Sequence, residues 1–318
     1  MPCYNEEEVI KAFYEETKKV LNNISAYTFQ FIFIDDGSKD RTLEYIMCLA
    51  EEYSEVKYLS FSRNFGKEAG MYAGLKHSTG DYAVIMDADL QHPPKLLPKM
   101  IKEVQNNHDC CAARRVKRRG NEMFRNLFSK VYYKISNKLT NVELVQGAVD
   151  YRIMTRQMVK AVIELAEVQR FSKGIFEWVG FDTKWISYED IDRTIGKTKW
   201  SFFGLFKYGI SGITAFSVVP LQIVTVMGFF ISLFAFIYIA ITLVRTFVYG
   251  IEVPGYVTTL SAVLFLGGII ELSIGILGEY IAQIYMEAKD RPIYILKQTN
   301  IKQVKENELK NIEDEKQN

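Results

Sequence analysis

Two long stretches without charge in the second half of the chain constrain its fold more than any other feature. Residues 208–244 contain no Asp, Glu, Lys or Arg, and residues 256–278 contain only Glu271. A helix of about twenty apolar residues is enough to cross a hydrocarbon layer of about 30 Å. We therefore predict two membrane spans, at about 225–244 and 257–278, behind an N-terminal part with the composition of a soluble domain.

The charges beside these spans predict their orientation. Two spans bring both flanks to one side of a membrane, and Arg245 lies in the hairpin between them. The flanks carry Lys197, Lys199, Lys207, Lys289, Arg291 and Lys297. Because positively charged loops stay in the cytoplasm, we predict a multi-pass protein of the cell (plasma) membrane with both termini and the N-terminal domain cytoplasmic. The opening "MPCYNEEEVIKAF" is not a basic and then apolar leader, so we expect no signal peptide.

Strands and helices alternate ahead of the spans. The apolar runs "FIFID" at 31–35 and "YAVIM" at 82–86 are typical of buried strands, and residues 6–24 place apolar side chains at helical spacing. This alternation predicts an α/β fold with a doubly wound, mostly parallel sheet. In such sheets ligands bind beyond the carboxyl ends of the strands, and this is where the chain carries its acids.

Acidic side chains follow two of these strands. Asp87 and Asp89 are two residues apart, so both can direct oxygens to one point. A hard divalent cation prefers such oxygens and shares them with substrate phosphates, and Gln91 can add a side-chain oxygen. The alternative is an ordinary loop with an Asx turn, which leaves both carboxylates in water. Asp36, at the end of the earlier strand, suits a ribose hydroxyl or a base N–H.

Four motifs together resemble one known family: "PCYNEEE", "IDDGSKDRT", "LSFSRNFGKEAGMYAGLKHSTGDYAVIMDADLQHPP" and "LFLGGIIELSIGILGEYIAQIYMEAKDRPIYI". Over residues 1–297 the chain is similar to the family 2 inverting glycosyltransferases, which have a GT-A, Rossmann-like fold. Within that family it resembles the branch that uses polyprenyl phosphates as acceptors. This branch includes the dolichyl-phosphate mannose synthase-like enzymes and the bactoprenol glucosyl transferases with two membrane helices.

The resemblance implies an activity and its partners. It implies transfer of a sugar, by preference glucose from UDP-glucose, to undecaprenyl phosphate at the cytoplasmic membrane face, for cell-envelope glycan modification. The implied partners are a nucleotide sugar, a polyprenyl phosphate lipid, the membrane, a divalent metal (Mg²⁺ or Mn²⁺) and further copies of the chain in a homotetramer. A formal net charge of +1 gives no reason to expect nucleic acid.

Two alternatives stay open. A processive polysaccharide synthase shares the nucleotide motifs, but it would need more spans and a "QxxRW" element, and "VQRFSKG" at 168–174 lacks the Trp. A non-catalytic, membrane-anchored nucleotide-sugar binder would not depend on metal ligands.

The resemblance also implies roles for single residues. The positions that hold the nucleobase and ribose correspond to Tyr4, Glu6 and Asp36. The positions that hold the metal and the diphosphate correspond to Asp87, Asp89 and Gln91. The acid at the reacting centre, which acts together with Asp89, corresponds to Asp150 in "GAVDYRIM". The positions near the acceptor phosphate correspond to Arg115, Arg125 and Ser129, with Arg114 and Arg118 as alternatives. The positions beside the diphosphate or the lipid entrance correspond to Arg193, Lys197 and Lys199.

The chemistry predicts that the metal-binding acids contribute more to the reaction rate than Asp150 does. Breaking a sugar–diphosphate bond builds negative charge on the leaving group, which a metal held by Asp87 and Asp89 would neutralise. The second pKa of a phosphomonoester is about 6, so the acceptor phosphate is already mostly dianionic at neutral pH and needs little help from a base. We therefore expect Asp150 to orient substrates more than to remove a proton.

Four segments are predicted along the chain. They are a catalytic domain over 1–199, an amphipathic helix in the membrane interface over 200–216, a transmembrane region over 217–286 and a cytosolic, partly disordered tail over 287–318. Relatives carry an apolar strand ahead of "PCYNE", whereas here Met1 comes directly before Pro2. We therefore expect the first strand of the sheet to be missing.

One face of the second span carries small residues and an acid. At about 3.6 residues per turn, Gly267, Glu271, Gly275 and Gly278 share a face. Small residues allow helices to approach closely, and a carboxyl group inside a membrane normally faces protein. We expect this face to lie against the first span or another subunit.

Overall fold

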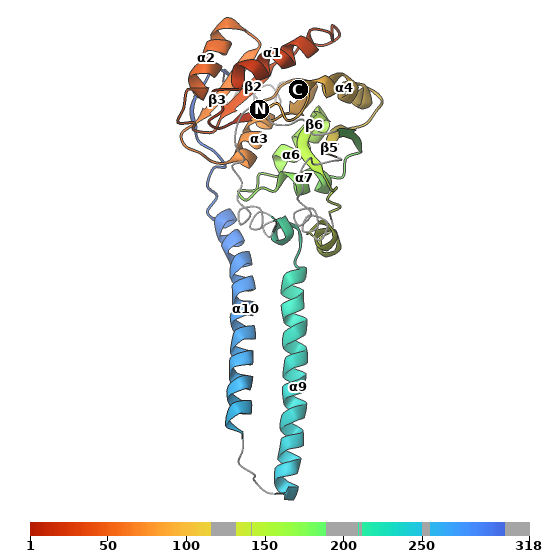
Figure 1. Ribbon diagram of the computed structural model, residues 1–318, viewed down its shortest axis with the longest axis vertical. Helices are drawn as coiled ribbons and strands as arrows, with labels where there is room; N and C mark the ends of the chain where they lie inside the picture. Colours follow the sequence, from red (N-terminus) through yellow and green to blue (C-terminus); the bar gives the residue numbers. More distant parts are fainter. Residues whose placement is uncertain (116–131, 141, 189–208, 210–211, 250–254, 303–318) are drawn as a thin grey trace, which may run out of the picture. The chain divides into compact units, whose positions relative to one another are not determined.

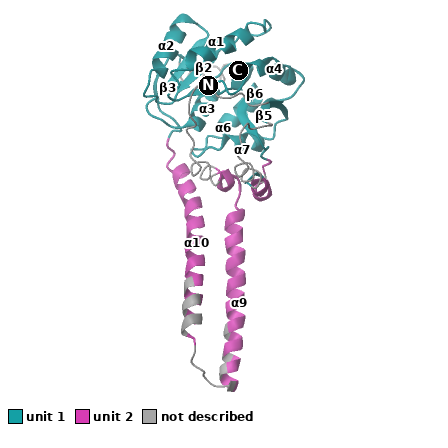
Figure 2. Cartoon of the chain, viewed as in Figure 1, with its two compact units in different colours: residues 1–133, 144–200, 292–318 teal, residues 134–143, 201–291 magenta. Residues whose placement is uncertain are grey.

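The computed structural model describes residues 1–115, 132–140, 142–188, 209, 212–249 and 255–302. The chain divides into two compact units, coloured separately in Figure 2. Unit 1 comprises residues 1–133, 144–200 and 292–318, and unit 2 comprises residues 134–143 and 201–291.

Unit 1 contains two four-stranded sheets flanked by helices (Figure 1). The first sheet has the order β1-β2-β3-β8, in which β1, β2 and β3 are parallel and β8 is antiparallel to β3. Its strands are β1 (Pro2–Cys3), β2 (Phe31–Asp35), β3 (Val56–Phe61) and β8 (Leu296–Thr299). The second sheet has the order β4-β6-β5-β7, with β6 antiparallel to both of its neighbours and β5 parallel to β7. Its strands are β4 (Tyr82–Ile85), β5 (Cys110–Arg115), β6 (Ala148–Thr155) and β7 (Thr183–Tyr188).

Helices connect these strands and cover the sheets. They are α1 (Ile10–Leu21), α2 (Thr42–Glu52), α3 (Lys67–Lys76), the 3₁₀ turn η1 (Pro94–Leu96), α4 (Leu97–Gln105), α6 (Arg156–Glu164) and α7 (Ser172–Trp178). Alternate side chains of β2 enter two different cores. Phe33 lies in the larger core with Phe13 of α1, while Ile34 lies in a smaller core with Ala69 and Ala73 of α3. The predicted α/β class is confirmed, and the sheets are mixed because β6 and β8 run antiparallel to their neighbours.

Residues of both sheets line a cavity of about 820 Å³. It is lined by residues of β2, including Phe31 and Ile32, and by Tyr82–Ile85 of β4. Among the described residues no strand joins β2 to β4, so the sheets stay separate. The two-residue β1 pairs with Ile34 and Asp35 only. The absence of a longer first strand stays a prediction.

The segment after the second long helix returns to the first sheet. We expected residues 287–318 to be partly disordered because of their charge. Residues 296–299 instead form β8 on the edge of β3, and Thr299 Oγ1 donates a hydrogen bond to Tyr58 O at 2.6 Å. This part of the tail is ordered, because edge pairing and a few apolar side chains outweigh its charge. Residues 303–318 lie outside the described residues, and disorder there stays a prediction.

Tyr294 anchors this returning segment. Its ring stacks on Phe61 with centroids 5.0 Å apart, and its hydroxyl lies 3.1 Å from Nε2 of His77. Removing a large ring from a core leaves a cavity as well as unmade contacts. Because Tyr294 is only partly buried, we expect Tyr294→Ala to lower the free energy of unfolding by about 2 kcal/mol, measured by thermal unfolding in detergent. The neighbouring Ile295 is 51% exposed, so Ile295→Ala should leave stability almost unchanged, and equal losses would contradict this anchoring role.

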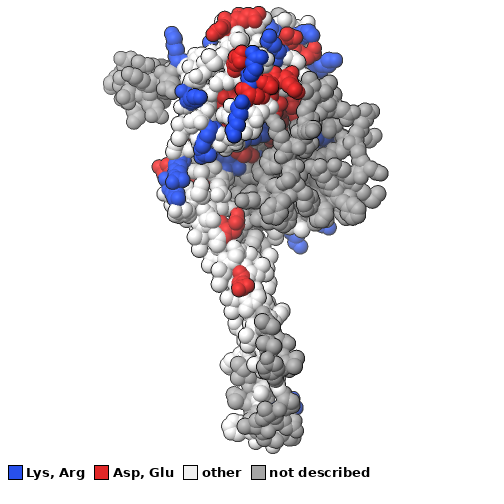
Figure 3. All heavy atoms as spheres, turned by 60° about the vertical axis from the view of Figure 1, so that its left-hand side comes forward, with Lys and Arg blue, Asp and Glu red and all other residues white. Residues whose placement is uncertain are grey.

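Unit 2 is built on two long helices, α9 (Val219–Tyr249) and α10 (Tyr256–Ala288). Their most apolar stretches, residues 219–242 and 265–288, are long and apolar enough to cross a membrane. On the face that Figure 3 shows, the described surface of this hairpin carries few charged side chains, whereas charged side chains are numerous on unit 1. Both helices extend beyond the predicted spans. The amphipathic helix predicted at 200–216 lies mostly outside the described residues.

Among the described residues, nothing covers the glycine face of α10. A Cβ added at Gly267, Gly275 or Gly278 would meet no heavy atom within 4 Å, and Glu271 is exposed. The prediction that the first span covers this face is therefore wrong for the described residues. Cover by another subunit stays a prediction.

Candidate active site

Two acids from neighbouring strands face each other at the carboxyl end of β4. The antiparallel β4–β6 ladder sets Ile85 opposite Arg152, and the same register continued by two residues sets Asp87 opposite Asp150. Facing residues of antiparallel strands have Cβ atoms about 5 Å apart. Two carboxylates at this spacing repel each other unless a cation is placed between them.

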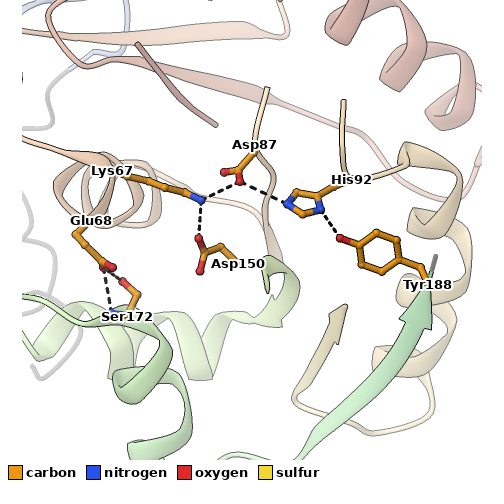
Figure 4. A network of polar contacts seen from close by, with 7 residues as sticks. All are labelled: Lys67, Glu68, Asp87, His92, Asp150, Ser172 and Tyr188. Atoms are coloured by element: carbon orange, nitrogen blue, oxygen red, sulfur yellow. Dashed lines mark hydrogen bonds and ion pairs between the residues drawn. The ribbon is translucent and has the colours of Figure 1, made fainter. Parts of the chain in front are cut away.

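Lys67, the first residue of α3, supplies that cation (Figure 4). Its Nζ lies 2.8 Å from Oδ2 of Asp87 and 2.5 Å from Oδ2 of Asp150. The side chains of Lys67, Asp87 and Asp150 are 36%, 24% and 14% exposed, so water screens these ion pairs less than it screens surface pairs. One ammonium thus holds together Asp87, predicted from the sequence as a metal ligand, and Asp150, predicted as the acid at the reacting centre.

The ion pairs decide the charge state of this cluster. Burial by itself would raise the pKa of both carboxyl groups and lower the pKa of the lysine. The opposite charges outweigh burial, so that Lys67 lowers the pKa of Asp87 and of Asp150 below their usual values. The two carboxylates in turn raise the pKa of Lys67. All three groups are charged at neutral pH, and the cluster carries a net negative charge.

A second contact holds Asp87 from the other side. Nε2 of His92 lies 3.4 Å from the same Oδ2 of Asp87, and Nδ1 of His92 lies 2.7 Å from the hydroxyl of Tyr188 (Figure 4). We assign the tautomer in which Tyr188 donates to Nδ1 and the Nε2–H points at Asp87, since it satisfies all three groups. His92 is buried, so this chain from β7 fixes the orientation of Asp87.

Asp36 organises the loop that leads into α3. The side chain is buried, and its two oxygens accept the backbone N–H groups of Phe65 at 2.6 Å and Gly66 at 2.9 Å. Gly66 has a φ of 96°, a value that L side chains rarely adopt. Burial raises the pKa of Asp36, although these N–H groups oppose the rise. Asp36 therefore positions Lys67, the next residue along the chain.

Glu68 ties the same helix end to a third element. Its Oε2 accepts the backbone N–H of Ser172 at 3.0 Å and the Ser172 hydroxyl, both at the start of α7 (Figure 4). The first turn of α3 is thus linked to β2 through Asp36, to β4 and β6 through Lys67, and to α7 through Glu68. This makes residues 65–68 the connection between the two sheets at the site.

The predicted nucleotide-side residues Tyr4 and Glu6 lie in the loop after β1. This loop is tied to the turn after β2, since the N–H of Asn5 donates to Ser38 Oγ at 3.0 Å and the N–H of Glu6 donates to Thr42 Oγ1 at 2.8 Å. The loop follows Cys3, whose carbonyl accepts the N–H of Asp36. Their contacts with a nucleotide stay a prediction.

Asp89 and Gln91 lie in the loop after β4 with Asp87. Oδ1 of Asp89 accepts the N–H of Gln91 at 3.1 Å, which is the Asx turn considered as the alternative to a metal site. Among the described residues no group of three or more His, Cys, Asp and Glu side chains could hold a metal ion. Two carboxylates and an amide oxygen nevertheless fit Mg²⁺ or Mn²⁺, because substrate phosphates and water normally complete such sites.

The remaining predicted residues divide into two groups. Arg115 ends β5, opposite Tyr188 of β7 in the second sheet. The others lie outside the described residues, namely Arg125, Ser129, Arg193, Lys197 and Lys199, as does the alternative Arg118.

Sequence reasoning missed Lys67, His92 and Tyr188. Lys67 carried a usable signal, because a lysine in the first turn of a helix opposes the helix dipole and needs an acidic partner. His92 lies one residue after Gln91 in the quoted acidic motif, so its place beside Asp87 could have been inferred. Tyr188 gave no signal, since its approach depends on the packing of β7.

The α/β domain with its acidic cluster and the apolar helical hairpin each match a known family. Residues 1–163 match glycosyl transferase family 2, and residues 219–284 match the GtrB C-terminal hairpin. The chain belongs to glycosyl transferase family 2, and it is a glycosyltransferase.

Similar proteins span nearly the whole chain. CsbB of Bacillus subtilis (strain 168) is 48% identical over 95% of this chain and 91% of its own length. The bactoprenol glucosyl transferase of Shigella phage SfX is 38% identical over 93% of this chain and 97% of its own. A prophage bactoprenol glucosyl transferase homolog of Escherichia coli (strain K12) is 39% identical over the same shares. Among solved structures, a mannosyltransferase from Pyrobaculum calidifontis in complex with GDP-Man and Mn²⁺ is 16% identical, with a TM-score of 0.45 over 90% of this chain and 83% of its own.

Proposed function

We propose that this protein transfers a glucosyl residue from UDP-glucose to a polyprenyl phosphate, undecaprenyl phosphate, at the cytoplasmic face of the cell membrane. The observation that carries this proposal is the similarity to bactoprenol glucosyl transferases across both the acidic cluster and the apolar hairpin. N-acetylglucosamine is the next donor sugar to consider, and mannose follows.

In the proposed reaction one bond forms and one breaks. An oxygen of the lipid phosphate attacks the anomeric carbon of the sugar, and the bond from that carbon to the nucleoside diphosphate breaks on the opposite side. The diphosphate leaves with the bonding electrons, so the configuration inverts and no proton has to move. Asp150 orients the sugar and acceptor, and Lys67 holds Asp150 in place.

Asp87, Asp89 and Gln91 would hold a divalent cation beside the diphosphate. The chemistry that such an ion supplies is neutralisation of the charge on the leaving group. His92 and Lys67 both contact Oδ2 of Asp87 and fix the orientation of this carboxylate. Tyr4, Glu6 and Asp36 are proposed to bind the nucleobase and ribose of the donor.

In this proposal the hairpin brings the active site to the membrane, where the lipid acceptor lies. α9 and α10 would anchor the protein in the lipid layer where polyprenyl phosphate lies, with both chain ends in the cytoplasm. Lys289, Arg291 and Lys297 follow α10 and support this orientation by the positive-inside rule. Arg125, Ser129, Arg193, Lys197 and Lys199 are proposed to bind the phosphates of the two substrates.

A transfer assay tests the proposed function. Membranes containing the full chain, undecaprenyl phosphate and Mg²⁺ are incubated with radiolabelled UDP-glucose, UDP-N-acetylglucosamine or GDP-mannose. We expect label in the organic-solvent extract with UDP-glucose. Label in an insoluble polymer would indicate the processive synthase instead, and nucleotide-sugar binding without transfer would indicate the non-catalytic binder.

A further inference from the structure

The cation at the centre of the acidic cluster opposes the metal that the cluster would bind. Oδ2 of Asp87 already receives Lys67 at 2.8 Å and His92 at 3.4 Å. A divalent cation bound by Asp87 would place two further positive charges close to the Lys67 ammonium. Charges at such distances interact strongly where water is partly excluded, so Lys67 must weaken the binding of a cation at Asp87.

The backbone on both sides of Lys67 is held in place. The N–H groups of Phe65 and Gly66, directly before it, are held by the buried Asp36. Glu68, directly after it, holds the start of α7. The ammonium also lies at the N-terminus of α3, where the helix dipole repels a cation, so its two carboxylate partners are what keep it there.

A bound diphosphate changes this balance. It carries negative charge to the same place and offsets the repulsion between the ammonium and a divalent cation. Binding of the two partners is then linked, and each raises the affinity for the other by the same factor.

We propose that Lys67 is a positioning residue that makes divalent-cation binding at Asp87 depend on the nucleoside diphosphate. This inference rests on the proposed function, since that function supplies the diphosphate. The positive charge of Lys67 then has two effects. It holds Asp87 and Asp150 together, and it lowers the affinity of the site for a divalent cation as long as no donor is bound. The site would therefore bind the divalent cation together with the nucleotide-sugar donor and would bind the cation alone only weakly.

Mn²⁺ alone provides the direct test. Binding of Mn²⁺ to the full-length protein in detergent is measured by electron paramagnetic resonance without nucleotide and then with saturating UDP. We expect Lys67→Met to bind Mn²⁺ at least about tenfold more tightly than the wild type without UDP. The factor by which UDP raises Mn²⁺ affinity should fall correspondingly in this variant. Lys67→Arg keeps the charge and should leave Mn²⁺ affinity near the wild-type value.

Two further variants keep the test decisive. Lys76→Met removes the same charge from the opposite end of α3, where the side chain is exposed, and should leave Mn²⁺ binding unchanged. If Lys67→Met does not fold, Lys67→Gln is neutral, can still donate to a carboxylate and carries the same expectation.

Unchanged or weaker Mn²⁺ binding in a folded neutral variant would overturn the proposal. A wild-type protein that binds Mn²⁺ equally well with and without UDP would overturn it too. Failure of the proposed function would be seen in a different experiment, because the transfer assay would then give no labelled lipid. The measurement of Mn²⁺ binding without UDP would still show whether Lys67 weakens cation binding.

Discussion

Asp89→Asn is expected to lower kcat for sugar transfer on the order of 10³-fold, which is the typical loss when a group that stabilises transition-state charge is removed. An amide keeps the shape of the carboxylate but not its charge, so it holds a divalent cation poorly. The leaving diphosphate then develops its charge without neutralisation. Asp89 suits this test better than Asp87, because a change at Asp87 would also release Lys67 and His92.

Asp150→Asn should cost much less, about tenfold in kcat, as expected for a group that orients its neighbours. The acceptor phosphate needs no base, and an amide can still accept a hydrogen bond from Lys67. Initial rates at saturating donor measure both effects, and a chelator should abolish the wild-type rate until Mg²⁺ or Mn²⁺ is restored. Asp81→Asn, at the exposed amino end of β4, is the matched control. Equal losses at Asp89 and Asp150, or transfer that ignores the chelator, would contradict this division of roles.

The features that sequence predicted well are those with a local physical cause. Residues 219–249 and 256–288 are helical because an apolar run of that length has to satisfy its backbone internally. Asp36 and Asp87 lie just beyond the ends of β2 and β4, because an unpaired charge is costly inside a buried strand. Asp150 instead lies inside β6, where Lys67 pairs with it. The alternation of strands and helices gave the fold class.

The features that escaped prediction depend on long-range packing. β8 pairs with a strand more than 200 residues earlier in the chain, and its charged sequence gives little sign of it. The bridge from Lys67 to Asp150 needs the β4–β6 register, which places residues 87 and 150 opposite each other. By sequence, the glycine face of α10 could lie against the first span or against another subunit, and among the described residues the first span does not cover it.

Asp36→Ala should damage both stability and donor binding. The substitution leaves the N–H groups of Phe65 and Gly66 without the carboxylate that accepts them. A hydrogen bond to a charged group contributes about 1.5–3 kcal/mol, and removing the buried charge returns part of its desolvation cost. We therefore expect the free energy of unfolding to fall by about 3 kcal/mol. Because the start of α3 is no longer fixed, Lys67 should also lose its position, and affinity for UDP should fall.

The pH dependence separates the charge of Asp36 from its hydrogen bonds. Burial raises the pKa of Asp36, so the folded state binds this proton more tightly than the unfolded chain does. The contribution of Asp36 to stability is therefore largest at low pH and falls as pH rises through its folded pKa. Asp36→Asn cannot ionise and should lack this fall, while Asp35→Asn, which alters bonds to Ser38 and Ser60 instead, should retain it. Thermal unfolding of the three proteins between about pH 4 and pH 8 measures the difference; parallel profiles for wild type and Asp36→Asn would show that ionisation of this carboxyl does not act on the fold.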